Sequence, residues 1–137
     1  MAAVEQLLRI EGDGSISFGN HTLAVKAKLE YFKYNGDLLK VKTFKTMTKL
    51  EKNGMFVYES VPGTSVLHFL ETGEGVDFKV EGNEDAQITV GLEDETEYEV
   101  IVNEQNAGSM KTNLGGKLNV SVELADAGEV SVSIKKK

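Results

Sequence analysis

The sequence predicts an all-β protein with two lobes: an N-terminal β-meander of long hairpins, residues 1–71, and a C-terminal immunoglobulin-like β-sandwich, residues 72–137. Two observations predict this fold class. Apolar and polar residues alternate with a period of two in many short runs, most cleanly in residues 118–124 and 130–134. Since successive side chains of a strand point to opposite faces, each run has one dry and one wet face. Turn-forming residues separate the runs at short, regular intervals.

The N-terminal lobe is expected to consist of hairpins, because three glycine-containing turns each lie between two strand-like runs. These turns are Gly12-Asp13-Gly14, Asn35-Gly36 and Asn53-Gly54, and the runs beside them are residues 7–11, 15–18, 23–31, 38–44, 45–52 and 55–58. Pro62-Gly63 suits a type II turn. Residues 66–70 are apolar except for His68 and fit either a buried strand or one helical turn.

The C-terminal lobe is expected to hold about six short strands, which is typical of a small sandwich. Alternation is clear in residues 76–80, 86–90, 98–102, 118–124 and 130–134. Turn formers lie between these runs at Gly82-Asn83, residues 93–97, Asn106-Ala107-Gly108, Gly115-Gly116 and Asp126-Ala127-Gly128. The boundary between the lobes is placed near residues 71–75, where both charge sign and strand length change.

The amino-acid composition limits which cellular compartment the protein is expected in and which kinds of site it can form. The 137 residues include no Cys, which excludes disulfides and thiolate metal sites. The first ten residues show no basic leader before a long apolar run, and no stretch approaches the roughly 18 apolar residues of a membrane span. A cytoplasmic protein is therefore expected, with a surface or phage-derived fibre component as the alternative.

Charge is segregated along the chain, although the net charge is −7. Residues 26–52 hold eight lysines and three acidic residues, whereas residues 71–129 hold fifteen acidic residues and three lysines. Such asymmetry can steer association or favour head-to-tail contacts between copies. The alternative is that these charges only form the wet faces of half-buried strands.

The sequence contains no recognisable motif for catalysis, cofactor binding or metal binding, so no catalytic residue, cofactor or metal ligand is predicted. His21 follows Gly19-Asn20 in an expected turn and is interpreted as solvated, and His68 as partly buried with a hydrogen-bond partner. The chain has no nucleophile elbow, phosphate-binding loop or dinucleotide fingerprint. With 22 acidic residues, the presence of carboxylates alone indicates little about glycoside hydrolysis.

One segment indicates a binding surface, because lysines and aromatic residues alternate with one another in residues 26–52. If no bulge intervenes, one strand face gathers the candidate binding surface: Lys26, Lys28, Phe32, Tyr34, Lys40 and Lys42. A wet face of lysines and rings suits a polyanion such as an acidic glycan, whereas nucleic acid is not the expected partner of this acidic chain. The alternative is that the lysines keep an exposed sheet soluble.

Several sequence segments resemble those of a family of small proteins from Gram-positive anaerobes that are often automatically labelled endosialidase. They are residues 44–54, 56–64, 96–100 and 110–118, and the similarity covers nearly the whole chain. The label implies cleavage of an acidic glycan, polysialic acid. The resemblance also extends to accessory β-domains, which implies a binding or assembly module, and it assigns no functional residue.

The function predicted from these observations is a non-catalytic binding or assembly module that self-associates into a homo-oligomer. The alternatives are a glycan-active or glycan-binding protein and a polyanion binder that uses residues 26–52. A glycan-cleaving enzyme is expected to have a pocket in which two carboxylates converge, or one carboxylate with Tyr31, Tyr34 or Tyr58. A binding module is expected to have a flat or grooved surface.

Overall fold

The computed structural model describes residues 4–137, so the first three residues of the predicted N-terminal lobe lie outside the described part. The described chain forms thirteen β-strands and no helix, which confirms the all-β prediction. The strands are β1 (Leu8–Ile10), β2 (Ile16–Phe18), β3 (Ala27–Tyr34), β4 (Asp37–Thr43), β5 (Thr48–Lys52), β6 (Met55–Val61), β7 (Ser65–Thr72), β8 (Gly75–Glu81), β9 (Ala86–Gly91), β10 (Glu97–Val102), β11 (Gln105–Lys111), β12 (Lys117–Val122) and β13 (Val130–Lys136).

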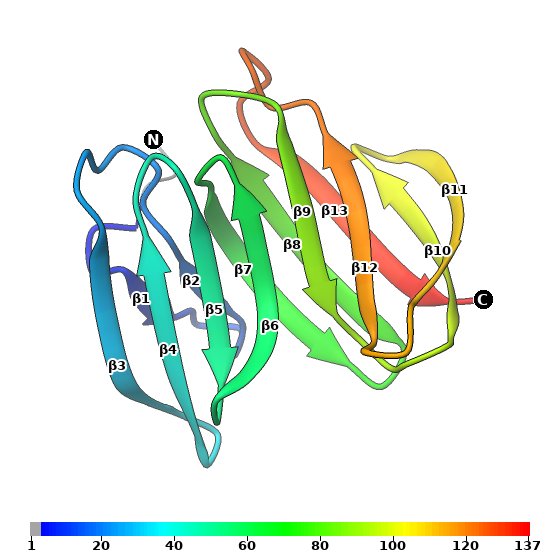
Figure 1. Ribbon diagram of the computed structural model, residues 1–137, viewed down its shortest axis with the longest axis horizontal. Helices are drawn as coiled ribbons and strands as arrows, with labels where there is room; N and C mark the ends of the chain where they lie inside the picture. The colour runs from blue at the N-terminus through cyan, green and yellow to red at the C-terminus, as the bar shows by residue number, and fades with distance from the viewer. Residues whose placement is uncertain (1–3) are drawn as a thin grey trace.

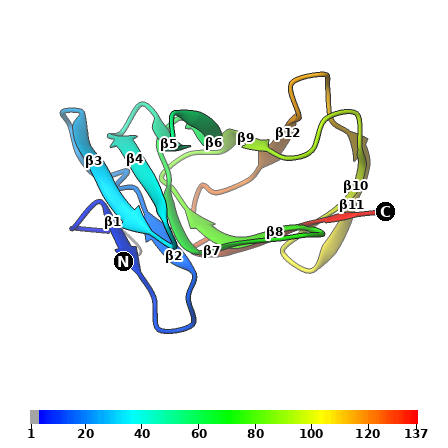
Figure 2. The same ribbon diagram turned by 90° about the horizontal axis from the view of Figure 1, so that it is seen from below.

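The strands form two antiparallel sheets that face each other as two layers (Figures 1 and 2). One sheet has seven strands in the order β1-β2-β7-β8-β13-β10-β11, and the other has six in the order β12-β9-β6-β5-β4-β3. The consecutive antiparallel strands β3 to β6 form the predicted meander. The immunoglobulin-like topology of residues 72–137 stays a prediction.

The predicted division between residues 71 and 72 falls inside β7. Strand β7 pairs with β8 from Ser65↔Glu81 to Thr72↔Gly75, so one sheet continues across this position. The other sheet also combines both halves, because β6 pairs with β9. A single cluster of buried apolar residues extends through both halves of the chain. The two predicted lobes therefore share both sheets and one core.

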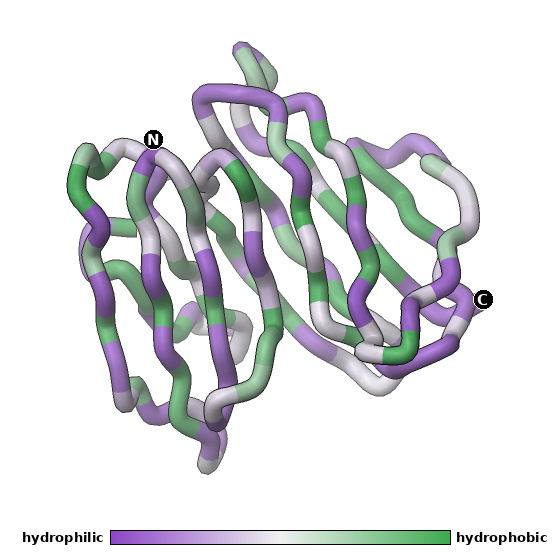
Figure 3. The backbone as a smooth tube through the Cα atoms, in the orientation of Figure 1, coloured by the Kyte–Doolittle hydropathy of each residue, from purple (hydrophilic) through white to green (hydrophobic). Residues whose placement is uncertain are grey.

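The core lies between the two sheets, as the alternation in the sequence requires. Along β12, for example, Leu118, Val120 and Val122 are buried while the residues between them are exposed. Figure 3 shows the same alternation of apolar and polar residues along most strands. The rings of Phe18 and Tyr58 meet edge to face, with centroids 5.3 Å apart. Full burial of each large apolar side chain stabilises the fold by about 1.5 to 3 kcal/mol.

The two Asn-Gly turns form the tight hairpins that the sequence predicts. Asn35-Gly36 connects β3 to β4, and Asn53-Gly54 connects β5 to β6. Both residues of each turn have positive φ, 49° and 85° in the first turn and 52° and 79° in the second. Asn and Gly tolerate this conformation best, and its twist matches that of the flanking strands. These residues therefore fix the register of the meander.

Strand β11 was missed by the sequence prediction, which placed a turn at Asn106-Ala107-Gly108. That prediction is wrong, because the turn lies at Asn103-Glu104, where both residues have positive φ. Strand β11 is the edge of the seven-stranded sheet, and all of its residues except Met110 are exposed. A strand with no buried face needs no apolar alternation, so this pattern could not reveal it.

The segment between β6 and β7 also differs from its prediction. Gly63 lacks the positive φ that a type II turn requires after Pro62, and the Val61–Pro62 peptide is cis, so the predicted turn is wrong. Gly63 instead lies against the carbonyl of Phe44, where an added Cβ atom would be 1.9 Å from that oxygen. The apolar run at residues 66–70, for which two interpretations stood, belongs to strand β7.

A network of buried hydroxyl groups crosses the interior beside this segment. The Thr48 hydroxyl donates to the Thr64 carbonyl over 2.7 Å, accepts from the Thr64 N–H over 3.1 Å and contacts the Thr43 hydroxyl at 2.8 Å. The Thr64 hydroxyl contacts those of Tyr58 and Ser60. All five side chains are fully buried, and burial raises the pKa of Tyr58. Such a network stabilises a fold only because each buried polar group has a partner.

Candidate functional site

The outer face of the six-stranded sheet carries a row of lysines. Lys28 on β3 lies directly opposite Lys42 on β4, and Lys42 lies directly opposite Lys49 on β5. Residues that pair in this way point to the same face, and neighbouring strands are about 4.8 Å apart. We call Lys28, Lys42 and Lys49 the lysine row. It brings three ammonium groups together on one exposed face.

Carboxylates compensate the lysine row only in part. Lys28 forms an ion pair with Glu30 at 3.0 Å, and Lys49 forms a longer one with Glu51 at 3.8 Å. Within residues 4–137, Lys42 has no carboxylate at ion-pair distance. The hydrogen bond and charge of Lys28, with the charge of Lys40, hold the pKa of Glu30 below its ordinary value. Glu30 is therefore ionised at neutral pH, and the central lysine keeps an uncompensated charge.

A β-bulge in β3 divides the predicted binding surface. Lys28 pairs with Lys42 before the bulge, but Phe32 pairs with Leu39 after it, with an extra residue between. Phe32 and Tyr34 consequently pack against the core, on the opposite face from the lysines. The prediction that the rings and lysines share one face is wrong, because it assumed an unbroken strand.

The remaining predicted residues lie near the lysine row. Lys40 is two residues before Lys42 on the same face, and it reaches Glu30 at 3.7 Å. Lys26 precedes β3, with its ammonium group 5.7 Å from the centre of the Phe44 ring. The structure thus brings Lys28, Lys40 and Lys42 together and places Lys26 beside them.

Tyr31 is the bulge residue, and the sequence analysis did not select it for the surface. Its φ is +60° and it is 76 % exposed, which is unusual for a bulky side chain. With Glu30, Leu38 and Lys40, it lines a cavity of about 240 Å³ beside the Asn53-Gly54 turn. The one available signal was the pair Tyr31-Phe32, where two aromatic residues in succession break the alternation.

His21 differs from its prediction, whereas His68 has the hydrogen-bond partner that was predicted but is more exposed than expected. His21 is buried, and its Nδ1 lies 2.7 Å from the Ser65 hydroxyl, so the solvated-turn interpretation is wrong. Burial lowers the pKa of His21, and the nearby charge of Glu81 partly opposes this effect. His68, predicted to be partly buried, has a side chain that is 50 % exposed and a hydrogen-bond partner in Ser15.

His68, Ser15 and Asp13 lie together, but they do not form a catalytic triad. Nδ1 of His68 is 3.1 Å from the Ser15 hydroxyl and 3.5 Å from the Asp13 carboxylate. A triad uses one ring nitrogen for the serine and the other for the carboxylate. Here Ser15 donates to Asp13 instead, and this bond lowers the pKa of Asp13. The cluster closes the β1–β2 turn against β7.

Glu71 and Glu93 line another cavity, of about 270 Å³, together with Tyr98. Each carboxylate forms an ion pair, Glu71 with Lys52 at 2.9 Å and Glu93 with Lys136. This arrangement favours a structural role for both side chains.

Within residues 4–137, His, Asp and Glu side chains form no group of three that could hold a metal ion. The same residues include no helix with the length and apolar character needed to cross a membrane.

Comparisons with known proteins identify no relative of this chain. No protein-family model matches the chain, no curated protein matches it, and no solved structure matches it. The resemblance to proteins labelled endosialidase therefore stays a prediction.

Proposed function

We propose that the chain is a non-catalytic binding module that holds a linear polyanion on the outer face of its six-stranded sheet. The observation that carries this proposal is the lysine row, in which Lys28, Lys42 and Lys49 lie directly opposite one another on three neighbouring strands. Like charges in such positions destabilise a sheet. An anionic ligand would remove this repulsion and gain charge-assisted contacts.

The geometry of the row indicates the shape of the ligand. The three lysines lie across the strands at intervals of about 4.8 Å, so they follow a line on a flat face. A polymer with regularly spaced sulfate, carboxylate or phosphate groups can place successive charges along this line. Lys40 extends the basic surface toward the cavity beside Tyr31. An acidic glycan is the ligand class that also uses an exposed ring, because pyranose C–H groups stack on aromatic faces.

Heparin is a suitable probe for the experiment. Wild-type protein should bind it with an affinity that falls steeply as salt rises from about 50 to 200 mM, because counterions are released on binding. The variant Lys28→Gln/Lys42→Gln/Lys49→Gln should lose most of this affinity, and its salt slope should fall by about two to three units. The control Lys79→Gln/Lys111→Gln/Lys135→Gln removes the same charge elsewhere and should keep the slope. An equal loss of heparin affinity in both variants would refute the proposal that the lysine row is the specific binding face.

A second candidate, a glycan-active protein, follows from the resemblance and is favoured by one observation. Glu30 and Tyr31 line the same cavity, so a carboxylate and a tyrosine lie side by side. The lowered pKa of Glu30 suits an anion or base rather than an acid. The test is incubation with a sialic acid polymer, with product length measured by anion-exchange chromatography. Cleavage that Glu30→Gln or Tyr31→Phe abolishes would support this candidate, and an unchanged polymer would contradict it.

A further inference from the structure

The two ends of the sandwich carry opposite charges and expose different sheet edges. Strand β3 is the free edge of the six-stranded sheet at one end, and β11 and β12 are the free edges of the two sheets at the other (Figure 1). Residues 26–52, which include β3, hold eight lysines and three acidic residues, whereas residues 93–137 hold nine acidic residues and five lysines. Two of these five, Lys136 and Lys137, form ion pairs with Glu93 and Glu97. One end of a copy therefore complements the other end of a second copy in charge.

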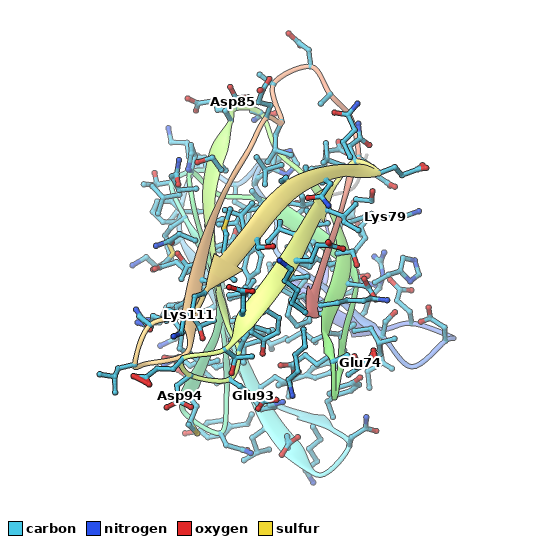
Figure 4. All side chains as sticks on the ribbon, turned by 90° about the vertical axis from the view of Figure 1, so that its right-hand side faces the viewer. Glu74, Lys79, Asp85, Glu93, Asp94 and Lys111 are labelled. Carbon is cyan, nitrogen blue, oxygen red and sulfur yellow. The ribbon has the colours of Figure 1, made fainter. Side chains whose placement is uncertain are left out.

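The acidic end contains the largest groove described in this molecule, about 530 Å³, between the free edges of β11 and β12. Its lining combines small apolar side chains, such as Ala107 and Ala125, with the polar side chains of Asn106 and Ser121. Glu123 and Asp126 add carboxylates. Neither carboxylate forms an ion pair within residues 4–137. In Figure 4, which views this end of the molecule, charged side chains surround β10 and β11. The groove therefore suits an amphipathic side chain, with an apolar ring and a hydroxyl group, that has positive charges nearby.

The basic end presents such a side chain. Tyr31 is 76 % exposed, and its φ of +60° results from the bulge that pushes it out of β3. Lys33 on β3 and Lys26 just before β3 are exposed and have no ion-pair partner among the described residues. A bulge at an edge hinders the regular addition of another strand. Contact at this edge therefore uses projecting side chains rather than a longer sheet.

We propose that copies of this chain associate head to tail, with Tyr31 of one copy in the groove between β11 and β12 of the next. Lys26 and Lys33 then face the acidic end that carries Glu123 and Asp126. Because the two surfaces differ, the contact is heterologous, and repetition produces a filament or a closed ring. This assembly goes beyond polyanion binding. It leaves the lysine row free but covers Tyr31, so a polyanion bound to the assembled form would contact the lysines and not the ring.

Variants with reversed charges at either end test this interface, and sedimentation velocity at low salt measures their assembly. Wild-type protein should show species whose size grows with concentration and falls when salt is added. Lys26→Glu/Lys33→Glu and Glu123→Lys/Asp126→Lys should each sediment as monomers. An equimolar mixture of the two variants should assemble again, because each altered end then meets an end of opposite charge. Tyr31→Ser should weaken assembly about tenfold or more, as loss of a central aromatic contact does.

The control Lys45→Glu/Lys79→Glu changes the same number of charges, on the β4–β5 connection and on β8, and should assemble like the wild type. Thermal unfolding of each variant shows whether it is folded, and each altered end provides an independent test. A wild-type protein that is monomeric at every concentration and low salt would overturn the proposal. So would a mixture of the two charge variants that stays monomeric. Heparin binding through the lysine row is measured separately, so either proposal can fail without the other.

Discussion

Lys28 and Lys42 lie directly opposite each other on β3 and β4, and Lys49 extends this contact to β5. Only the outer two lysines have a carboxylate partner in the described chain, so the positive charge is greatest at Lys42. Cross-strand pairs of like charge reduce stability. The presence of three such residues in one row is the basis of the proposed polyanion site.

Substitution of Lys42 should therefore stabilise the protein while it weakens binding. We expect Lys42→Gln to raise the free energy of unfolding by up to about 1 kcal/mol at low salt, because two like-charge contacts disappear. The gain should shrink at high salt, where repulsion is screened. Urea unfolding at two salt concentrations measures both effects. A loss of stability at low salt would show that repulsion in the row is negligible.

Tyr31 offers a second case in which stability and function oppose each other. Its φ of +60° is unfavourable for a bulky residue and ordinary for glycine. We expect Tyr31→Gly to raise the free energy of unfolding by about 0.5 to 1 kcal/mol. Lys33→Gly, at a position on β3 with no positive φ, is the matched control and should lower it by about as much. Destabilisation by both substitutions would contradict the strain assigned to the bulge.

The buried hydroxyl network should depend strongly on Thr48. We expect Thr48→Val to lower the free energy of unfolding by about 2 to 4 kcal/mol, since the N–H and C=O of Thr64 both lose a buried partner. Thr89→Val, on the outer face of the same sheet, is the isosteric control and should change it by less than about 0.5 kcal/mol. Chemical unfolding measures both changes in free energy. If Thr48→Val lowers it as little as Thr89→Val does, water replaces the Thr48 hydroxyl as the partner of Thr64.

Sequence reasoning succeeded where one face of a strand is buried and a turn has specific conformational needs. The alternation in residues 118–124 and 130–134 identified β12 and β13, and Asn35-Gly36 and Asn53-Gly54 located two hairpins. Such patterns record burial and backbone conformation directly.

It failed where tertiary contacts decide the outcome. The bulge at Tyr31 moved Phe32 and Tyr34 to the core side, because one extra residue exchanges the two faces of a strand. The lysines of the predicted site were therefore identified, but their relation to the rings was not. Burial of His21 arises from contact with Ser65, 44 residues away, which no local pattern indicates.

That burial gives a pH dependence with a defined sign. The pKa of His21 is lowered in the folded protein, so the unfolded chain binds the proton more readily. Stability from this residue is present above its ordinary pKa of about 6.5 and is lost as pH falls below that value. The pKa values of Glu11, Asp13 and Glu30 are also lowered, but these groups change the free energy of unfolding only at more acidic pH.

We therefore expect the free energy of unfolding to fall between about pH 7.5 and 5.5, and to fall less in His21→Asn. Urea unfolding at several pH values, for both proteins, measures the two slopes. Parallel curves would show that another group causes the change.

The most direct test of the polyanion site is amide chemical-shift mapping with a short heparin oligosaccharide. The proposed site predicts that the largest changes follow the lysine row across β3, β4 and β5 and continue to Lys40 and Tyr31, with little change along β11. Such changes should disappear in Lys28→Gln/Lys42→Gln/Lys49→Gln. Changes centred on another surface, or no change at saturating oligosaccharide and low salt, would contradict the proposal that this face holds the ligand.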